Sequence, residues 1–387
     1  MRSPLLLLSA FILYVAAQQA PEMLSGYAGE RAHLVGFQFA QLVTGFGAVV
    51  AAGYVLSRHS PFPIIAAGLA SAILAALLAF LTVDHPASGP PIAGLVVQSN
   101  PFERAIGSFF NPNYFGLFEA IAIVIAIGLL PTARSRLIRW ILLVIAIVLG
   151  AAVALSFSRG ALVALAAGLV CLGIARGRAR IALLLGGSVL VAMVIVYPIF
   201  VQWRVDETFG EASRDTYAAL AASDAGRLRG VLAGPTLFLS SPLFGVGWGH
   251  YSFLAAEMAG LPNRIAAHNW YMNTLAEQGL VGIVLWTLLL ASLVVGLRSR
   301  SLPARTVGVA VLGTYVVGSV FLEPPASFQT SALAIIAIVA ALVSDWTAPG
   351  KPDSELPTPT ESEGHQRGLQ VLPTRRGSLA RSSRRSA

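Results

Sequence analysis

The chain has 387 residues, of which 56% are hydrophobic and only 11% are charged. A soluble domain carries about 25% charged residues, so this composition excludes a soluble fold and predicts a large apolar surface that faces lipid. The net charge of +8 does not indicate a nucleic-acid partner, because the basic residues are spread over short segments between apolar runs.

Ten apolar stretches approach or reach the length of a membrane span, which is about 20 residues. The sequence therefore predicts an all-α polytopic membrane protein with about ten transmembrane helices. In chain order, the stretches are residues 4–20, 34–56, 62–83, 115–131, 138–156, 160–175, 181–200, 279–297, 306–322 and 328–344.

The first stretch has two interpretations. Arg2, the apolar run Leu5–Ala17 and the small residues Ala16 and Ala17 also fit a cleavable signal peptide. We favour an uncleaved anchor. Cleavage would remove one span and leave the orientation of every later span unchanged.

The distribution of arginine predicts the orientation of the spans. With the N-terminus in the cytoplasm, the short outer loops hold only Arg31, Arg104 and Arg159. Cytoplasmic loops are enriched in Lys and Arg, so we expect both termini in the cytoplasm. The cytoplasmic loops then hold Arg2, Arg58, Arg134, Arg136, Arg139, Arg176, Arg178, Arg180, Arg298, Arg300 and Arg305.

Two segments depart from the pattern of spans. Within a transmembrane domain of residues 1–344, residues 201–278 form a long outer segment between spans seven and eight. Its apolar stretches, glycines and aromatic residues predict an ordered loop, and loops of such length are usually functional or disordered. Residues 345–387 are rich in Pro, Ser, Thr and Arg, which predicts a disordered basic cytoplasmic tail.

Charged residues near the predicted outer membrane edge are candidates for chemistry. Arg159 lies between two apolar runs with almost no loop around it, where a charge needs a partner. A guanidinium can bind a phosphate through two hydrogen bonds, although an arginine there could also extend to lipid headgroups. Glu119 is the one carboxylate within a predicted span. It could contact substrate or form a structural ion pair with Arg159.

The long outer segment holds further candidates. Asp224-Ala225-Gly226-Arg227-Leu228-Arg229 opens a predicted helix, and Arg227 and Arg229 cannot share one face of it. One arginine should face a site and the other solvent. Gly245-Val246-Gly247-Trp248-Gly249 lacks the spacing of a dinucleotide-binding loop and predicts a turn with closely packed backbone, next to the weaker candidate His250.

His268 is the strongest local candidate. It opens a short helix that leads into the eighth span, just above the predicted bilayer. An imidazole titrates near neutral pH and can take a proton from a hydroxyl, although a capping role is an equal alternative on sequence alone. No acidic cluster has metal-ligand spacing and no nucleotide-binding loop is present, so we expect neither a metal nor another cofactor.

Four motifs occur in the order found in one family. They are Gly107-Ser108-Phe109-Phe110-Asn111-Pro112-Asn113, then Ser158-Arg159-Gly160, then Gly226-Arg227 with Pro242-Leu243-Phe244-Gly245-Val246-Gly247, and last His268-Asn269 with Gly279-Leu280-Val281-Gly282. In this respect residues 107–282 resemble the O-antigen ligases and related surface-polysaccharide polymerases. The first three predicted spans resemble no family.

The resemblance implies a membrane glycosyltransferase in the bacterial inner membrane that acts at its periplasmic face. The donor would be a glycan on undecaprenyl pyrophosphate and the acceptor a hydroxyl of lipid A-core, with membrane lipids around the site. It assigns catalysis to Arg159, Arg227 and His268 in a metal-independent, inverting reaction. We expect substrate contacts from Arg229, Asn113, Asn269, Glu119 and His250.

Three alternatives remain open on the sequence. A polymerase would use lipid-linked glycan as the acceptor, and a related enzyme would transfer glycan to protein. A lipid-linked-sugar transporter would place charged or broken helices at the membrane midplane, usually in two similar halves, which are not detectable here. A non-catalytic scaffold would not bring Arg159, Arg227 and His268 together in space.

Overall fold

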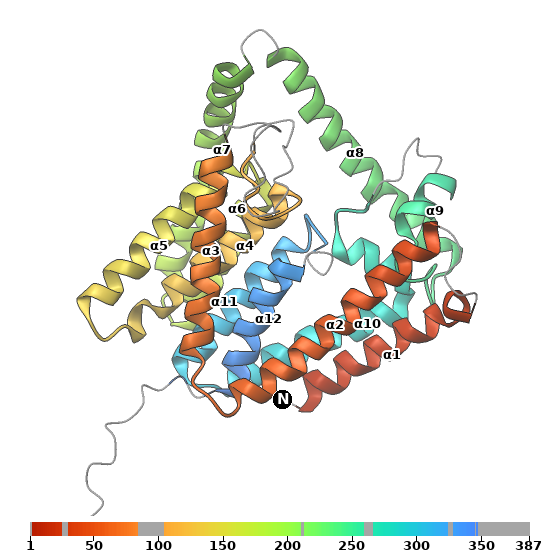
Figure 1. Cartoon of the computed structure of the whole chain (residues 1–387), viewed down its shortest axis with the longest axis horizontal. Coiled ribbons are helices and arrows are strands. Elements are labelled where there is room, and N and C mark those ends of the chain that lie inside the picture. The colour runs from red at the N-terminus through yellow and green to blue at the C-terminus, as the bar shows by residue number, and fades with distance from the viewer. Residues whose placement is uncertain are drawn as a thin grey trace, which may run out of the picture. The chain divides into compact units, whose positions relative to one another are not determined.

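The computed structural model describes residues 2–24, 30–83, 104–209, 213–258, 266–323, 328–344 and 346. Within these residues all regular secondary structure is helical, which confirms the predicted all-α class (Figure 1). The helices are α1 (Arg2–Leu24), α2 (Glu30–Leu56), α3 (Phe62–Thr82), α4 (Pro112–Leu129), the 3₁₀ turn η1 (Leu130–Thr132), α5 (Arg136–Leu155), α6 (Arg159–Ala175), α7 (Ala179–Phe209), α8 (Ser213–Ser240), α9 (Tyr251–Met258), α10 (Trp270–Arg298), α11 (Leu302–Gly318) and α12 (Phe328–Val343).

Seven helices of the described chain are long and apolar enough to cross a membrane, and each coincides with a predicted span. The chain is therefore a multi-pass membrane protein. The other three predicted spans coincide with shorter apolar helices, at Arg159–Ala175, Leu302–Gly318 and Thr330–Val343.

Helix α4 is the centre of the packed helices. In its apolar stretch 78% of the residues are buried, compared with 6% in the apolar stretch of α7. It packs against α5, α6, α11 and α12. Helix α7 instead exposes large apolar side chains along its length, among them Leu184, Val194 and Ile199. In a membrane these side chains contact lipid, so their exposure carries no cost in water.

Helix α10 breaks at Gly279, where φ is 63° and ψ is −160°. Backbone groups beside such a break lose their helical partners and need others in apolar surroundings. The segment Pro242–Gly247 supplies these partners. The carbonyls of Pro242 and Leu243 accept the N–H groups of Leu280 and Val281 at 2.9 and 3.2 Å.

The same segment satisfies carbonyls on the other side of the break. Val246 N–H donates to Ala276 O at 3.0 Å, and Gly247 N–H donates to Glu277 O at 2.9 Å. Helix α1 completes the arrangement, because Tyr14 Oη donates to Gln278 O at 2.8 Å. The predicted close packing of this glycine-rich turn is thus confirmed. The turn supplies hydrogen-bond partners for the backbone on both sides of the break in α10.

The predicted outer segment is largely helical where it is described. Helix α7 continues to Phe209, α8 follows from Ser213, and Figure 1 shows α8 running from α7 toward α9 and α10, both of which it contacts. The predicted tail 345–387 lies outside the described residues, apart from Trp346. The Trp346 indole N–H donates to Ala340 O at 3.1 Å.

We predict that Gly279→Ala destabilises the fold. The backbone conformation at Gly279 is close to glycine-only, which costs another residue about 1–3 kcal/mol. A Cβ there would also lie 2.5 Å from Leu243 O. The melting temperature in detergent should fall clearly. Gly150→Ala in α5 is the control, since its Cβ would meet no atom within 4 Å. Equal melting temperatures for the two variants would contradict the prediction.

Candidate functional site

A cavity of about 560 Å³ lies where several helix ends meet. It is bordered by the starts of α4 and α6, the middle of α7 and α8, His268 before α10 and the turn after α11. Its polar lining comes from Arg104, Asn113, Ser158, Arg159, Tyr197, Asp224, Arg227 and His268. These polar residues come from five parts of the chain that are far apart in sequence.

The start of α4 positions the first of these side chains. Asn111 is the N-cap residue, and its side chain accepts the N–H of Asn113 at 2.8 Å. Pro112 follows at the first helical position, where no backbone N–H is needed. Asn113 then lines the cavity, and its Oδ1 accepts Arg104 Nη2 at 2.7 Å.

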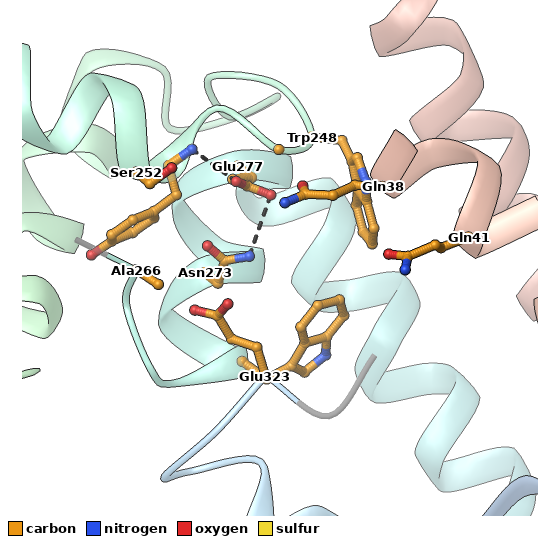
Figure 2. Close-up of a pocket in the computed structure, with 11 residues that line it drawn as sticks. Gln38, Gln41, Trp248, Ser252, Ala266, Asn273, Glu277 and Glu323 are labelled. Atoms are coloured by element: carbon orange, nitrogen blue, oxygen red, sulfur yellow. Dashed lines mark hydrogen bonds between the residues drawn. The ribbon is translucent and has the colours of Figure 1, made fainter. Parts of the chain in front are cut away.

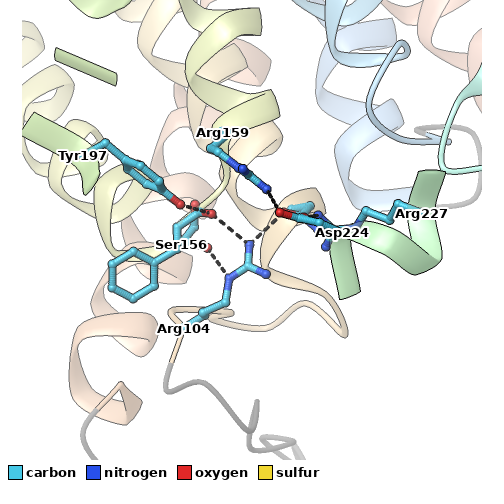
Figure 3. A network of polar contacts seen from close by, with 8 residues as sticks. Arg104, Ser156, Arg159, Tyr197, Asp224 and Arg227 are labelled. Atoms are coloured by element: carbon cyan, nitrogen blue, oxygen red, sulfur yellow. Dashed lines mark hydrogen bonds and ion pairs between the residues drawn. The ribbon is translucent and has the colours of Figure 1, made fainter. Parts of the chain in front are cut away.

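The turn before α6 is conformationally strained. Phe157 has φ 49°, a left-handed value that is uncommon for a residue other than glycine. Its carbonyl accepts Tyr197 Oη at 2.6 Å and Arg104 Nη2 at 3.2 Å, and Arg104 Nε donates to Ser156 O at 2.8 Å (Figure 3). Such strain persists only where surrounding contacts hold it, and it clusters at functional sites. Ser158 then caps α6.

Two predicted catalytic arginines meet at one carboxylate. Arg159, the first residue of α6, donates from Nη2 to Asp224 Oδ2 at 2.5 Å. Arg227 lies one turn after Asp224 on α8 and approaches its other oxygen, with Nη1 3.5 Å from Oδ1. Figure 3 shows the Asp224 carboxylate between the two guanidiniums.

His268 reaches the cavity from a second strained position. Its φ is also 49°, and its backbone N–H donates to Glu323 Oε1 at 3.0 Å. Asn269 caps the following helix, because its side chain accepts the N–H of Met272 at 2.9 Å. The predicted short helix before the eighth span is confirmed, and it begins at Trp270.

A second, smaller cavity of about 80 Å³ lies beside the His268 segment. Glu323 and Glu277 both face it, together with Asn273 and the glutamines Gln38 and Gln41 (Figure 2). Glu277 is 3% exposed and accepts Tyr251 N–H at 2.8 Å and Asn273 Nδ2 at 3.3 Å. The contact with Tyr251 holds the first part of α10 against the start of α9.

Burial sets the protonation of the larger cavity. It lowers the pKa of Arg104 to about 10, which leaves that guanidinium charged at neutral pH. Burial also lowers the pKa of Arg227. The pKa of His268 falls because of burial and, secondarily, the charge of Arg227, so the imidazole is neutral at neutral pH. Burial raises the pKa of Glu323 to about 7.

The structure brings four of the eight predicted site residues together. Arg159, Arg227, His268 and Asn113 line the cavity. The other four do not. Arg229 is exposed on α8, Asn269 caps α10, Glu119 is buried in α4 and His250 is buried beside Trp248, whose carbonyl lies 3.0 Å from His250 Nδ1. Of the two arginines Arg227 and Arg229, the first therefore faces the cavity.

Glu119 does not form the ion pair with Arg159 that was one of its two expected roles. Arg159 binds Asp224 instead. The Glu119 carboxylate is fully buried, and neither oxygen has a hydrogen-bond partner among the described residues. Its burial at the core of α4 separates it from the cavity.

The sequence did not identify Arg104, Asp224, Tyr197 or Glu323 as site residues. Arg104 and Asp224 each carried a usable signal, since Arg104 is one of the few arginines in the short outer loops and Asp224 precedes the Gly226-Arg227 motif. Tyr197 and Glu323 lie at the ends of apolar runs, where an aromatic or a charged residue is common. Only the tertiary contacts distinguish them.

The cavity can bind a polyanion and accept a proton. Three guanidiniums surround a volume that is open to a ligand, and arginine binds phosphate oxygens with two parallel hydrogen bonds. A neutral imidazole on the same wall can serve as a general base. This combination fits displacement of a phosphate leaving group by a hydroxyl.

Residues 144–287 match the family model described as O-Antigen ligase. No curated protein matches the sequence. The matched segment contains Arg159, Asp224, Arg227 and His268 as well as the break at Gly279, and so it includes most of the polar wall of the cavity. The match confirms the predicted resemblance, since residues 144–287 of this chain are similar to the O-antigen ligase family.

Proposed function

We propose that the protein is a membrane glycosyltransferase that moves a glycan from undecaprenyl pyrophosphate to an acceptor hydroxyl of lipid A-core. One observation carries the proposal. Arg159, Arg227 and His268 are separated by long stretches of sequence, yet they line one cavity. The match of residues 144–287 to the O-antigen ligase family supports the reaction class.

Each residue has a distinct role in the proposed reaction. The guanidiniums of Arg159 and Arg227 bind the pyrophosphate and stabilise the negative charge that builds as it leaves. Arg104 is held by three oxygens of the protein and adds a third positive charge. The neutral His268 takes the proton of the acceptor hydroxyl as the new glycosidic bond forms. Attack opposite the pyrophosphate inverts the anomeric carbon, and no step uses a metal or another cofactor.

The proposed membrane topology places this cavity outside the cytoplasm. All ten apolar helices cross the bilayer in our proposal, in a transmembrane domain of residues 1–344 with both termini cytoplasmic. Alternating directions then put the starts of α4, α6 and α10 and the ends of α5, α7 and α11 on the periplasmic side. The cavity is lined beside these ends of α4, α5, α6, α10 and α11, and by Met193 and Tyr197 within α7. Residues 201–278 become a periplasmic catalytic segment.

The geometry disfavours a non-catalytic scaffold, which has no reason to gather charged side chains at one cavity. It also offers less to a transporter than to an enzyme, because much of the lining comes from the first residues of α4 and α6, the residues just before them and the residue two before α10. Transporters place their sites near the midplane.

The first prediction concerns transfer itself. The purified protein, mixed with glycan on undecaprenyl pyrophosphate and lipid A-core, should form glycosylated lipid A-core. His268→Ala should lower the rate by about 10²–10⁴-fold, which is the usual contribution of a general base. If glycan were instead transferred from one donor molecule to another, the protein would be a polymerase. Donor binding without either product would contradict an enzymatic function.

The second prediction separates Arg227 from its neighbour. Arg227→Ala should lower the transfer rate by about 10²–10³-fold, because a charge at the leaving group is lost. Arg229→Ala is the matched control: the same helix loses the same side chain, but Arg229 is exposed and does not line the cavity. It should retain nearly wild-type rates. Similar losses in both variants would contradict the assigned roles.

The third prediction concerns pH. The folded protein lowers the pKa of His268, so its imidazole stays neutral to more acidic pH than a free histidine. The transfer rate should therefore fall on acidification only below about pH 6.5, the ordinary value for histidine. The residual activity of His268→Gln should lack this acid limb. A limb centred above the ordinary value would contradict the base role.

A further inference from the structure

Asp224 occupies the position between the two catalytic guanidiniums. Its Oδ2 accepts Arg159 Nη2 at 2.5 Å, and its Oδ1 lies 3.5 Å from Arg227 Nη1. One carboxylate thus engages two arginines through its two oxygens, as two oxygens of one phosphate would. Of the described residues that line the cavity, Asp224 is the single acid.

The two contacts of Asp224 differ in origin. Asp224 and Arg227 are three residues apart on α8, so helix geometry keeps them adjacent with or without a ligand. Arg159 comes from α6, and its contact with Asp224 joins the two helices across the cavity. A ligand can therefore replace the contact between Arg159 and Asp224 without unfolding a helix.

The ion pair of Arg159 and Asp224 is exposed enough for a ligand to replace the carboxylate. The side chains of Arg159 and Asp224 are 57% and 46% exposed, and Arg227 is 35% exposed. Ion pairs exposed to this extent contribute little to stability, because solvent screens them. A pyrophosphate that carries a negative charge on each phosphorus therefore competes readily with one carboxylate for the same guanidiniums.

The charge balance of the cavity points the same way. Three arginines and one aspartate leave two positive charges uncompensated when His268 is neutral. A pyrophosphate that joins a lipid to a sugar also carries two negative charges, one on each phosphorus. The empty cavity would otherwise hold three neighbouring guanidiniums that repel one another. Asp224 reduces that repulsion before the donor arrives.

We propose that Asp224 is an internal anion that holds Arg159 and Arg227 in position until the donor pyrophosphate displaces it. The inference rests on the proposed function and adds a positioning residue to it. Asp224 touches neither the acceptor nor the breaking bond. It acts through the two arginines, so it competes with the pyrophosphate while it keeps their side chains oriented.

Pyrophosphate binding distinguishes this role from a purely structural one. We would titrate the purified full-length protein in lipid nanodiscs with inorganic pyrophosphate and follow the heat of binding. Asp224→Asn removes the competing charge and keeps the shape, so the Kd should fall about three- to tenfold. Asp206→Asn is the matched control, since Asp206 is an exposed carboxylate on α7 that does not line the cavity, and its Kd should equal that of the wild type.

An equal or higher Kd for Asp224→Asn would overturn the inference and show that Asp224 only fastens α8 to α6. The proposed function would survive that result, because wild-type binding would be intact. If the wild type bound no pyrophosphate at all, donor recognition and this inference would fail together.

A second measurement needs no variant. A water-soluble carbodiimide with an amine labels accessible carboxylates in the wild type, and mass spectrometry quantifies the label at Asp224. Displacement by inorganic pyrophosphate should raise labelling of Asp224 and leave Asp206 unchanged. Unchanged or lower labelling of Asp224 at saturating pyrophosphate would overturn the inference even if Asp224→Asn failed to fold.

Discussion

The site depends on a break in helix α10, where distant parts of the chain supply the hydrogen-bond partners that the helix backbone lacks. A backbone N–H or carbonyl without a partner costs several kcal/mol in an apolar environment. The break at Gly279 frees such groups on both sides, and the segment Pro242–Gly247 and Tyr14 of α1 satisfy them. The glycines make this close approach possible, because a Cβ on Gly245 would collide with the backbone of Glu277. The two glycine motifs of the family are therefore halves of one contact.

That contact fixes the direction of the first turns of α10 and hence the place of His268. The carboxylates of Glu277 and Glu323 accept backbone N–H groups of Tyr251 and His268 and so add further anchors to the same region. At the opposite wall Arg104 and Tyr197 hold the strained Phe157 carbonyl just before Arg159. Of the two described non-glycine residues in left-handed conformation, one is His268 itself and the other, Phe157, lies two residues before Arg159. Rigid support of this kind keeps charged side chains apart at fixed positions, which electrostatic catalysis requires.

Much of this arrangement was predictable from the sequence, for identifiable reasons. Hydropathy placed the apolar helices, because lipid demands long uninterrupted runs, and the motifs placed Arg159, Arg227 and His268. Helical periodicity showed that Arg227 and Arg229 must diverge, but it could not choose between them. A capping role was the alternative considered for His268, and the neighbouring Asn269 is the residue that caps α10. Asp224, Arg104 and Glu323 act through tertiary contacts that no local spacing encodes. Glu119 was misleading, since a lone carboxylate in an apolar helix indicates function in most settings but here meets neither arginine nor cavity.

The partnership between α1 and the break in α10 has a consequence for biosynthesis. Gln18 and Tyr14 contact carbonyls of residues 244, 277 and 278, which are made more than two hundred residues later. The first helix enters the membrane long before its partner leaves the ribosome, and until then its polar side chains face lipid or water. The late helix in turn cannot satisfy its backbone on insertion alone. Helices α1 and α10 therefore complete each other, and this wall of the cavity can assemble only after α10 has been inserted.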